Sequence, residues 1–127
     1  MLPSTTVRWH RWKGAYHAHY RIGKASEEGY VKVVEGIERK TLVFGKSTLM
    51  TEFRLKKGSI LPSHKHPHEQ TGYLVSGQIV LIVEGQKHNM APGDSWAISG
   101  DVEHAGEVLE DSVAVEIFSP IREDYLP

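Results

Sequence analysis

The chain has 127 residues and no cysteine, and its length suits a single domain with a core of its own. Its 15 Lys and Arg residues nearly balance 16 Asp and Glu residues, so no large basic field exists to bind nucleic acid or an anionic membrane. The lack of cysteine excludes a disulfide framework and a thiolate metal site, which leaves His, carboxylate and carbonyl oxygen to bind any transition metal.

The first 30 residues differ in composition from the rest of the chain. They are rich in aromatic and basic residues, such as Trp9, Trp12 and Arg11, and show no sustained helical or strand period. We interpret residues 1–30 as an N-terminal arm and residues 31–127 as one barrel domain. No apolar segment typical of a secretion signal is present, and the longest aliphatic run, Ile79–Val83, is far too short to span a membrane. We therefore expect a cytoplasmic protein with no membrane partner.

Short runs typical of β-strands recur from Val31 onward, separated by turn signals. No ten-residue stretch has a convincing helical pattern. The runs cover residues 30–36, 40–45, 47–58, 72–77, 78–85, 94–100 and 112–120. Strands at this spacing predict an all-β protein, either a sandwich or a barrel.

Two of these runs carry informative patterns. The run Gln78–Val83 is apolar on both faces after its first residue, so we expect another part of the structure to cover its outer side. In Val113–Phe118, strand alternation separates Glu116 from the face formed by Val113, Val115 and Ile117. Either Glu116 faces water, which the pattern alone favours, or it faces a pocket while the arm or a second subunit covers the aliphatic face.

Three histidines alternate in the segment Ser63–Tyr73, which reads SHKHPHEQTGY. Imidazole nitrogens lie about 2.0–2.1 Å from a bound zinc-like ion, so all ligand atoms must converge within roughly 4 Å. His64 and His66 can converge because alternate strand residues share a face, and Pro67 marks an interruption of the strand. The ligand after this bend is His68, Glu69 or Gln70. The other histidines do not lie in a cluster of potential ligands, and we expect surface or packing roles for His10, His17, His19 and His88.

These residues resemble the two short motifs of the cupins, a family of small β-barrels. The first motif is matched by Gly58, His64, His66, Gln70 and Gly77, with Gln at the usual Glu position. The second keeps the separation of Gly93 and His104, while Ser99, Asp101 and Val108 depart from its usual residues. The resemblance implies a cupin-type β-barrel, also called a double-stranded β-helix or jelly roll, in which His104 lies beside the earlier histidines.

The resemblance implies a metal site formed by His64, His66, Gln70 and His104. Gln70 has the family spacing after His66, whereas Glu69 is the chemical rival because a carboxylate is a better ligand than an amide. His68 is then a pocket-rim or solvent residue. A neutral ligand set leaves a divalent ion its full charge, which favours an anionic or oxygen-rich substrate. The ligands do not separate zinc, nickel, manganese, iron and copper.

A narrower resemblance covers about residues 37–126. The segments HPHEQTGYLVSG and Phe118–Leu126 are similar to signatures of the pectin-degradation cupins related to KdgF, which convert 4,5-unsaturated uronates to linear keto acids. The resemblance implies that Glu116, usually an Asp, is the catalytic acid or base, and that Arg122 binds the substrate carboxylate. It also implies an apolar wall at Phe118. Tyr73 is a further candidate for the pocket, although a strand Tyr is more often a core residue.

Less specific interpretations of these residues and of the whole protein are also possible from the sequence. Arg122 also fits a solvated charge run with the two acidic residues that follow it. The whole protein also fits a non-catalytic cupin that binds a metal or a sugar acid, or a mononuclear metal dioxygenase. Cupin barrels commonly pair, and the two-sided apolar run Gln78–Val83 gives a local reason to expect a homodimer.

Overall fold

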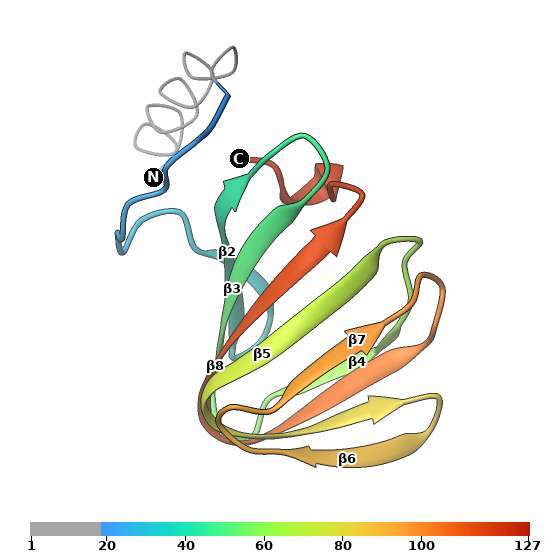
Figure 1. The fold of residues 1–127 in the computed structure, drawn as a ribbon. Coiled ribbons are helices and arrows are strands. Elements are labelled where there is room, and N and C mark those ends of the chain that lie inside the picture. Colours follow the sequence, from blue (N-terminus) through green and yellow to red (C-terminus); the bar gives the residue numbers. More distant parts are fainter. Residues whose placement is uncertain (1–18) are drawn as a thin grey trace.

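The computed structural model describes residues 19–127 of the chain, and its fold is all-β (Figure 1). Within this part of the chain the one helical element is a 3-10 turn, η2, at Glu123–Tyr125. Eight strands form one sheet: β1 Val31–Val34, β2 Ile37–Phe44, β3 Leu49–Leu55, β4 Ile60–His64, β5 Glu69–Val83, β6 Gln86–Met90, β7 Ser95–Ile98 and β8 His104–Ser119. The predicted all-β class is confirmed.

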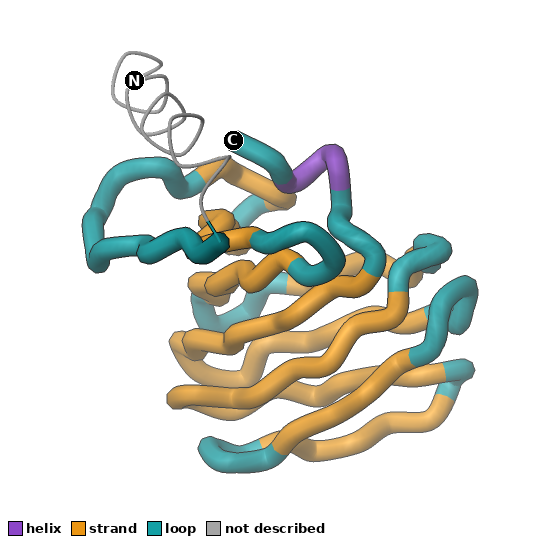
Figure 2. Tube along the Cα trace, turned by 45° about the horizontal axis from the view of Figure 1, so that its top comes forward, coloured by secondary structure: helices purple, strands orange, loops and turns teal. Residues whose placement is uncertain are grey.

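Two long antiparallel strands, β5 and β8, hold the barrel together. The first half of β5 pairs with β7 and with the second half of β8, which continues through β3 and β2 to β1. The second half of β5 pairs with β6, and the first half of β8 pairs with β4. The same two strands therefore contribute to both layers of the fold (Figure 1), and the tube view shows how strands make up nearly all of the barrel (Figure 2).

One predicted boundary between strands is wrong. The sequence pattern separates residues 72–77 from residues 78–85, whereas β5 runs through both. Gly77 has a φ of 91°, and the register against β8 shifts three times between Leu74 and Ile79. The glycine thus supports irregular pairing inside a continuous strand, because it adopts a left-handed conformation at little cost. The bend carries β5 from one layer into the other.

Apolar side chains fill the space between the layers. One cluster of buried residues consists of Ile37, Phe53, Leu74, Ile79, Val108 and Ala114. A smaller cluster, formed by Phe44, Leu49 and Phe118, lies under the C-terminal residues Ile121, Tyr125 and Leu126. Burying a side chain of the size of Leu74, which is fully buried, stabilises the fold by about 1.5–3 kcal/mol.

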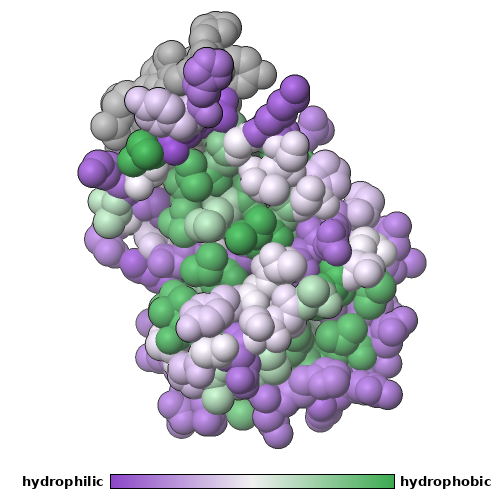
Figure 3. Space-filling model, in the orientation of Figure 1, coloured by the Kyte–Doolittle hydropathy of each residue, from purple (hydrophilic) through white to green (hydrophobic). Residues whose placement is uncertain are grey.

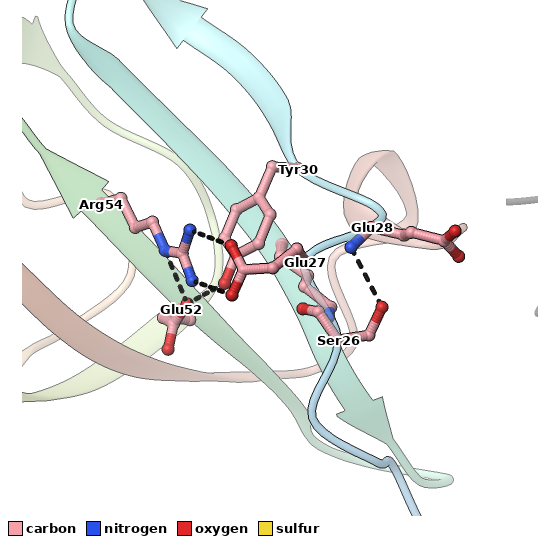
Figure 4. Close-up of polar contacts among 7 residues, drawn as sticks. Ser26, Glu27, Glu28, Tyr30, Glu52 and Arg54 are labelled. Atoms are coloured by element: carbon pink, nitrogen blue, oxygen red, sulfur yellow. Dashed lines mark hydrogen bonds and ion pairs between the residues drawn. The ribbon is translucent and has the colours of Figure 1, made fainter. Parts of the chain in front are cut away.

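The described part of the N-terminal arm has no regular secondary structure and docks on the strands β2 and β3. Arg54 donates two hydrogen bonds to the Glu27 carboxylate, at 2.8 and 3.2 Å, and the Tyr30 hydroxyl donates to Glu52 (Figure 4). The Lys40 ammonium donates to the Ser26 carbonyl at 2.6 Å. Residues 26–30 are thus fixed to the barrel, while residues 1–18 of the predicted arm lie outside the described part.

The apolar run Gln78–Val83 is covered within a single chain. Its central residues, Ile79, Val80 and Leu81, are each no more than 9% exposed, although they alternate between the two faces of the sheet. Two residues earlier on the same strand, Tyr73 and Val75, are about half exposed. Hydrophobic residues also form a band across the middle of the face seen in Figure 3. No helix among the described residues is long and apolar enough to cross a membrane.

Candidate metal centre and active site

Three of the predicted ligands converge at one end of the barrel interior. His64 at the end of β4 is directly opposite His104 at the start of β8, and their ring centroids are 4.3 Å apart. His66 lies in the connection between β4 and β5, with its ring centroid 5.1 Å from that of His104. One ring nitrogen from each histidine lies within 4.8 Å of those of the other two. Strand pairing therefore brings together residues that are forty positions apart in the sequence.

Backbone carbonyls orient the three rings. The Nδ1 atoms of His64, His66 and His104 lie 2.9, 3.1 and 2.8 Å from the carbonyl oxygens of Pro62, His68 and Val102. A carbonyl only accepts, so each Nδ1 carries the proton and each Nε2 keeps a free lone pair. Metal-binding histidines are commonly oriented by such a second hydrogen bond. The Nε2 atom of His66 is buried and has no hydrogen-bond partner in the described structure.

Both His66 and His104 have lowered pKa values. Burial is the main cause for each ring, and the nearby charges of Arg122 and of the other histidines add to it. A hydrogen bond to Val102 partly opposes the effect at His104. Lowered pKa values favour neutral imidazoles, the form that binds a metal.

Gln70, rather than Glu69, faces the histidines. The two residues begin β5, and their side chains point to opposite faces: Gln70 is 3% exposed, whereas Glu69 is exposed. The Gln70 Oε1 atom is buried without a hydrogen-bond partner in the described residues, while its Nε2 donates to Glu116 Oε2 at 2.6 Å. An amide oxygen without a partner beside three imidazoles fits a fourth oxygen ligand. These donors fit a divalent metal ion.

The histidines outside this group differ in position. His68 is half-buried, with its ring centroid 5.6 Å from that of His66, and its Nδ1 atom is buried without a partner among the described residues. His19 and His88 are exposed, as expected for surface residues. The predictions for His10 and His17 fall on residues outside the described part.

Glu116 faces the cavity beside this cluster, so the interpretation as an outward-facing strand residue does not hold. Its Oε2 atom accepts hydrogen bonds from Gln70 Nε2 and from Trp96 Nε1, the latter at 2.8 Å. Burial raises the pKa of Glu116 to about 7, against the opposing effects of these two donors and of the Arg122 charge. A carboxyl group with a pKa near neutrality is suited to accept or donate a proton.

Arg122 and two aromatic rings form a wall of the same cavity. The guanidinium group lies 3.9 Å from the Tyr125 ring centroid and 5.0 Å from that of Phe118, which is 1% exposed. Arg122 donates to Asp124 from Nε at 3.3 Å and from Nη2 at 2.7 Å. Burial disfavours the Asp124 anion, but this pairing outweighs the effect and lowers its pKa. The Arg122 side chain is only 14% exposed, so it is not a solvated member of a charge run.

Tyr73 does not line the cavity, which corrects its prediction as a pocket residue. It is 50% exposed and lies on the outer face of β5. The reason is strand alternation: Gln70, Gly72 and Leu74 occupy the inner face, so the residues between them point outward.

The cavity has a volume of about 340 Å³ and combines this polar cluster with the apolar core. The residues that line it without having been predicted for the site include Trp96, Tyr125 and the core residue Phe53. A signal for Trp96 exists in the sequence, because a buried indole N–H usually needs a hydrogen-bond acceptor. The position of that acceptor depends on strand pairing, which the sequence does not show.

Comparisons with known proteins agree with this geometry. The family model of the cupin domain matches residues 51–119. The pectin degradation protein KdgF of Dickeya dadantii (strain 3937) is 30% identical over 102 residues, which cover 79% of this chain and 93% of that protein.

Solved structures show the same relationship. The structure of KdgF from a Halomonas species has a TM-score of 0.78 and 30% identity, and the match covers 84% of this chain and all of that one. An RmlC-like cupin from Shewanella frigidimarina NCIMB 400 gives a TM-score of 0.77 with 25% identity, covering 84% and 96% of the two chains. The chain therefore belongs to the cupin family and is a KdgF-like member of it.

Proposed function

We propose that this protein is a metal-dependent enzyme that opens and ketonises 4,5-unsaturated uronates from pectin or alginate breakdown. The observation that carries the proposal is the convergence of His64, His66 and His104 with Glu116 and Arg122 in one cavity. The relationship to a pectin degradation protein supports the substrate class.

The reaction moves protons between oxygen and carbon. The C1 hydroxyl of the cyclic uronate loses its proton as the bond from C1 to the ring oxygen breaks, and the ring oxygen gains a proton, which gives an aldehyde and a C5 enol. The enol hydroxyl then loses its proton while C4 gains one, which gives a ketone. A divalent ion held by neutral ligands would polarise a bound substrate oxygen. The chain itself must bind the carboxylate and hold the moving protons.

Arg122 is suited to the carboxylate. Asp124 occupies the edge formed by Nε and Nη2, and no hydrogen bond within the described residues engages Nη1. The planar guanidinium group is therefore held in place with donors left for a second carboxylate, an arrangement that lysine cannot reproduce. Phe118 and Tyr125 pack against the same group and reduce its contact with water.

Glu116 is suited to proton transfer. It shares the cavity with the three histidines, and its raised pKa allows both protonation states near neutral pH. We assign it the protons that leave the two hydroxyls and the protons that reach the ring oxygen and C4. Binding by Arg122 would orient the substrate so that these atoms lie within reach of the carboxylate.

The test adds purified protein to a freshly prepared unsaturated monouronate and follows the loss of ultraviolet absorbance from its C4=C5 enol ether. We expect a loss well above the spontaneous rate, and chelator-treated protein should return the rate to the spontaneous one. A spontaneous rate with metal-loaded protein would exclude this substrate. Ligand binding without turnover would then support a binding protein, and oxygen uptake with iron or copper would support a dioxygenase.

We also propose a homodimer. Because Glu116 faces inward, the half-buried residues Val113, Val115 and Ile117 form an outer face of β8 beside the exposed Tyr73 and Val75. Light scattering should give twice the mass of the chain, and Val75→Lys should lower it because a charge would be buried in the interface. The mass of a single chain for the parent protein would exclude the dimer.

A further inference from the structure

Trp96 reaches the candidate acid or base across a neighbouring strand. Trp96 lies on β7 and Glu116 on β8, and both are paired with the same residue of β5, Gly72. The indole Nε1 nevertheless donates to Glu116 Oε2 at 2.8 Å. The ring must therefore pass over the position of Gly72 to reach its acceptor.

Gly72 makes this crossing possible because it has no side chain. A Cβ atom at this position would lie 2.1 Å from Trp96 Cε2 and 2.2 Å from Nε1, far inside van der Waals contact. Gly72 is not in a left-handed conformation, so the space for the indole is the reason for a glycine here. Any larger residue would displace the ring from Glu116.

The two donors leave Glu116 with one free oxygen. Trp96 Nε1 and Gln70 Nε2 both donate to Oε2, and no hydrogen bond within the described residues engages Oε1. Two donors from different strands fix the rotation of the carboxylate about its last bond. Oε1 is thereby left as the oxygen that can exchange a proton with a substrate.

We propose that Trp96, with the space provided by Gly72, is a positioning residue that holds Glu116 with Oε1 free for proton transfer; its catalytic part rests on the proposed uronate activity. Glutamate has one more methylene and one more rotatable bond than the aspartate of the KdgF-like signature. A misplacement of about 1 Å can cost roughly 10²-fold in rate. The indole compensates for the longer side chain by fixing where its carboxylate lies.

The kinetic test compares Trp96→Phe and Gly72→Ala with Tyr73→Phe. The first removes the N–H donor and keeps an aromatic ring, the second displaces the ring, and the third removes a polar hydrogen from an outward aromatic next to Gly72. We expect kcat to fall between about tenfold and 10²-fold in the first two, with KM within about twofold of the parent. Tyr73→Phe should keep the parent kcat.

A double-mutant cycle tests whether the effect passes through Glu116. In a Glu116→Gln background, Trp96→Phe should lower the residual kcat by less than about twofold, because the group that it positions no longer transfers protons. An equal loss of kcat in both backgrounds would overturn the inference. An unchanged kcat in Trp96→Phe would overturn it while leaving the proposed function in place.

A spectroscopic test needs no turnover. In ¹⁵N-labelled protein, the indole signal that Trp96→Phe removes should shift on Glu116→Gln, because a carboxyl acceptor is replaced by an amide. A Trp96 signal that ignores Glu116→Gln would overturn the inference. If the parent protein is inactive on the uronate, the proposed function fails, and this signal alone decides whether Trp96 holds Glu116.

Discussion

Two clusters of polar side chains in the described part of the chain satisfy their hydrogen bonds in opposite ways. The surface cluster, formed by Ser26, Glu27, Tyr30, Glu52 and Arg54, lies where the arm meets the strands β2 and β3 (Figure 4). The cavity cluster, formed by His64, His66, Gln70, His104 and Glu116, lies inside the barrel. Charge and hydrogen-bonding capacity alone do not distinguish them.

The difference lies in how each cluster satisfies its polar atoms. On the surface, the Arg54 guanidinium group is matched by the Glu27 carboxylate, and the Tyr30 hydroxyl by Glu52. In the cavity, His66 Nε2 and Gln70 Oε1 are buried and have no partner within the described residues. A buried polar atom without a partner costs about 1–3 kcal/mol. A cluster whose polar atoms hydrogen-bond to one another fixes the arm to the barrel. A cluster with buried polar atoms that have no partner indicates a binding site for a ligand.

The strongest test of this contrast is removal of a ligand from the cavity. His64→Ala should lower the bound metal, measured by elemental analysis, and reduce turnover to the spontaneous rate, because the site would lose one of its three histidine ligands. The matched control is His88→Ala, since His88 is exposed on β6. Full metal content and activity in His64→Ala would contradict the assignment of the site.

Glu116→Gln tests the carboxylate in the same way. We expect kcat to fall by roughly 10²–10⁴-fold, the usual contribution of a positioned acid or base, because the amide cannot exchange the proton. Glu52→Gln changes a carboxylate of the surface cluster and should leave kcat within about twofold. If the two variants have equal rates, Glu116 is not the proton-transfer group.

Glu116→Gln should also stabilise the folded protein, by an amount that depends on pH. The folded-state pKa of Glu116, about 7, lies above the ordinary value of 4.5, so the unfolded state loses this proton first as the pH rises. Ionised Glu116 therefore lowers the free energy of unfolding of the parent protein. This loss is absent below pH 4.5, grows between pH 4.5 and pH 7, and is constant at about 3 kcal/mol above pH 7.

Urea unfolding of the chelated proteins measures this effect. Glu116→Gln should have nearly the parent free energy of unfolding at pH 4 and a higher one at pH 8. A gain that is equal at both pH values would show that the titration of Glu116 is not its cause.

Arg122→Lys and Arg54→Lys compare an arginine that lines the cavity with an arginine of the surface cluster. Loss of the planar fork in the cavity should raise KM for the uronate by roughly 10–10²-fold, the equivalent of one charge-assisted hydrogen bond. In contrast, Arg54→Lys on the surface should leave KM unchanged. A KM in Arg122→Lys within about twofold of the parent would place the substrate carboxylate elsewhere.

The smallest effect is expected at the surface cluster. Tyr30→Phe removes the hydroxyl that donates to Glu52, which should lower the free energy of unfolding by about 1 kcal/mol, because only a part-buried hydrogen bond is lost. Urea unfolding measures this loss, and kcat should not change. A large loss of activity would show that the contact between the arm and the barrel influences the site, which would contradict a purely structural role for the surface cluster.

Much of the fold and part of the site could be predicted from local patterns. The alternating β-type runs predicted an all-β fold, and the spacing of His64 and His66 around Pro67 predicted a bend between ligands. The resemblance to cupins supplied His104 and the choice of Gln70 over Glu69. The single-strand identity of residues 69–83 was missed, because a glycine that ends a strand and a glycine that bends one look the same in the sequence.

The sequence by itself determined which residue types were present and which of them shared a strand face. The direction of that face was decided only by tertiary structure: Glu116 faces the cavity although its pattern favours water, and Tyr73 faces outward. The physical reason is that alternation has a period of two and fixes relative, not absolute, orientation. Likewise, Gly72, Trp96 and Glu116 are separated by at least twenty positions at each step, and only the pairing of three strands brings them into contact.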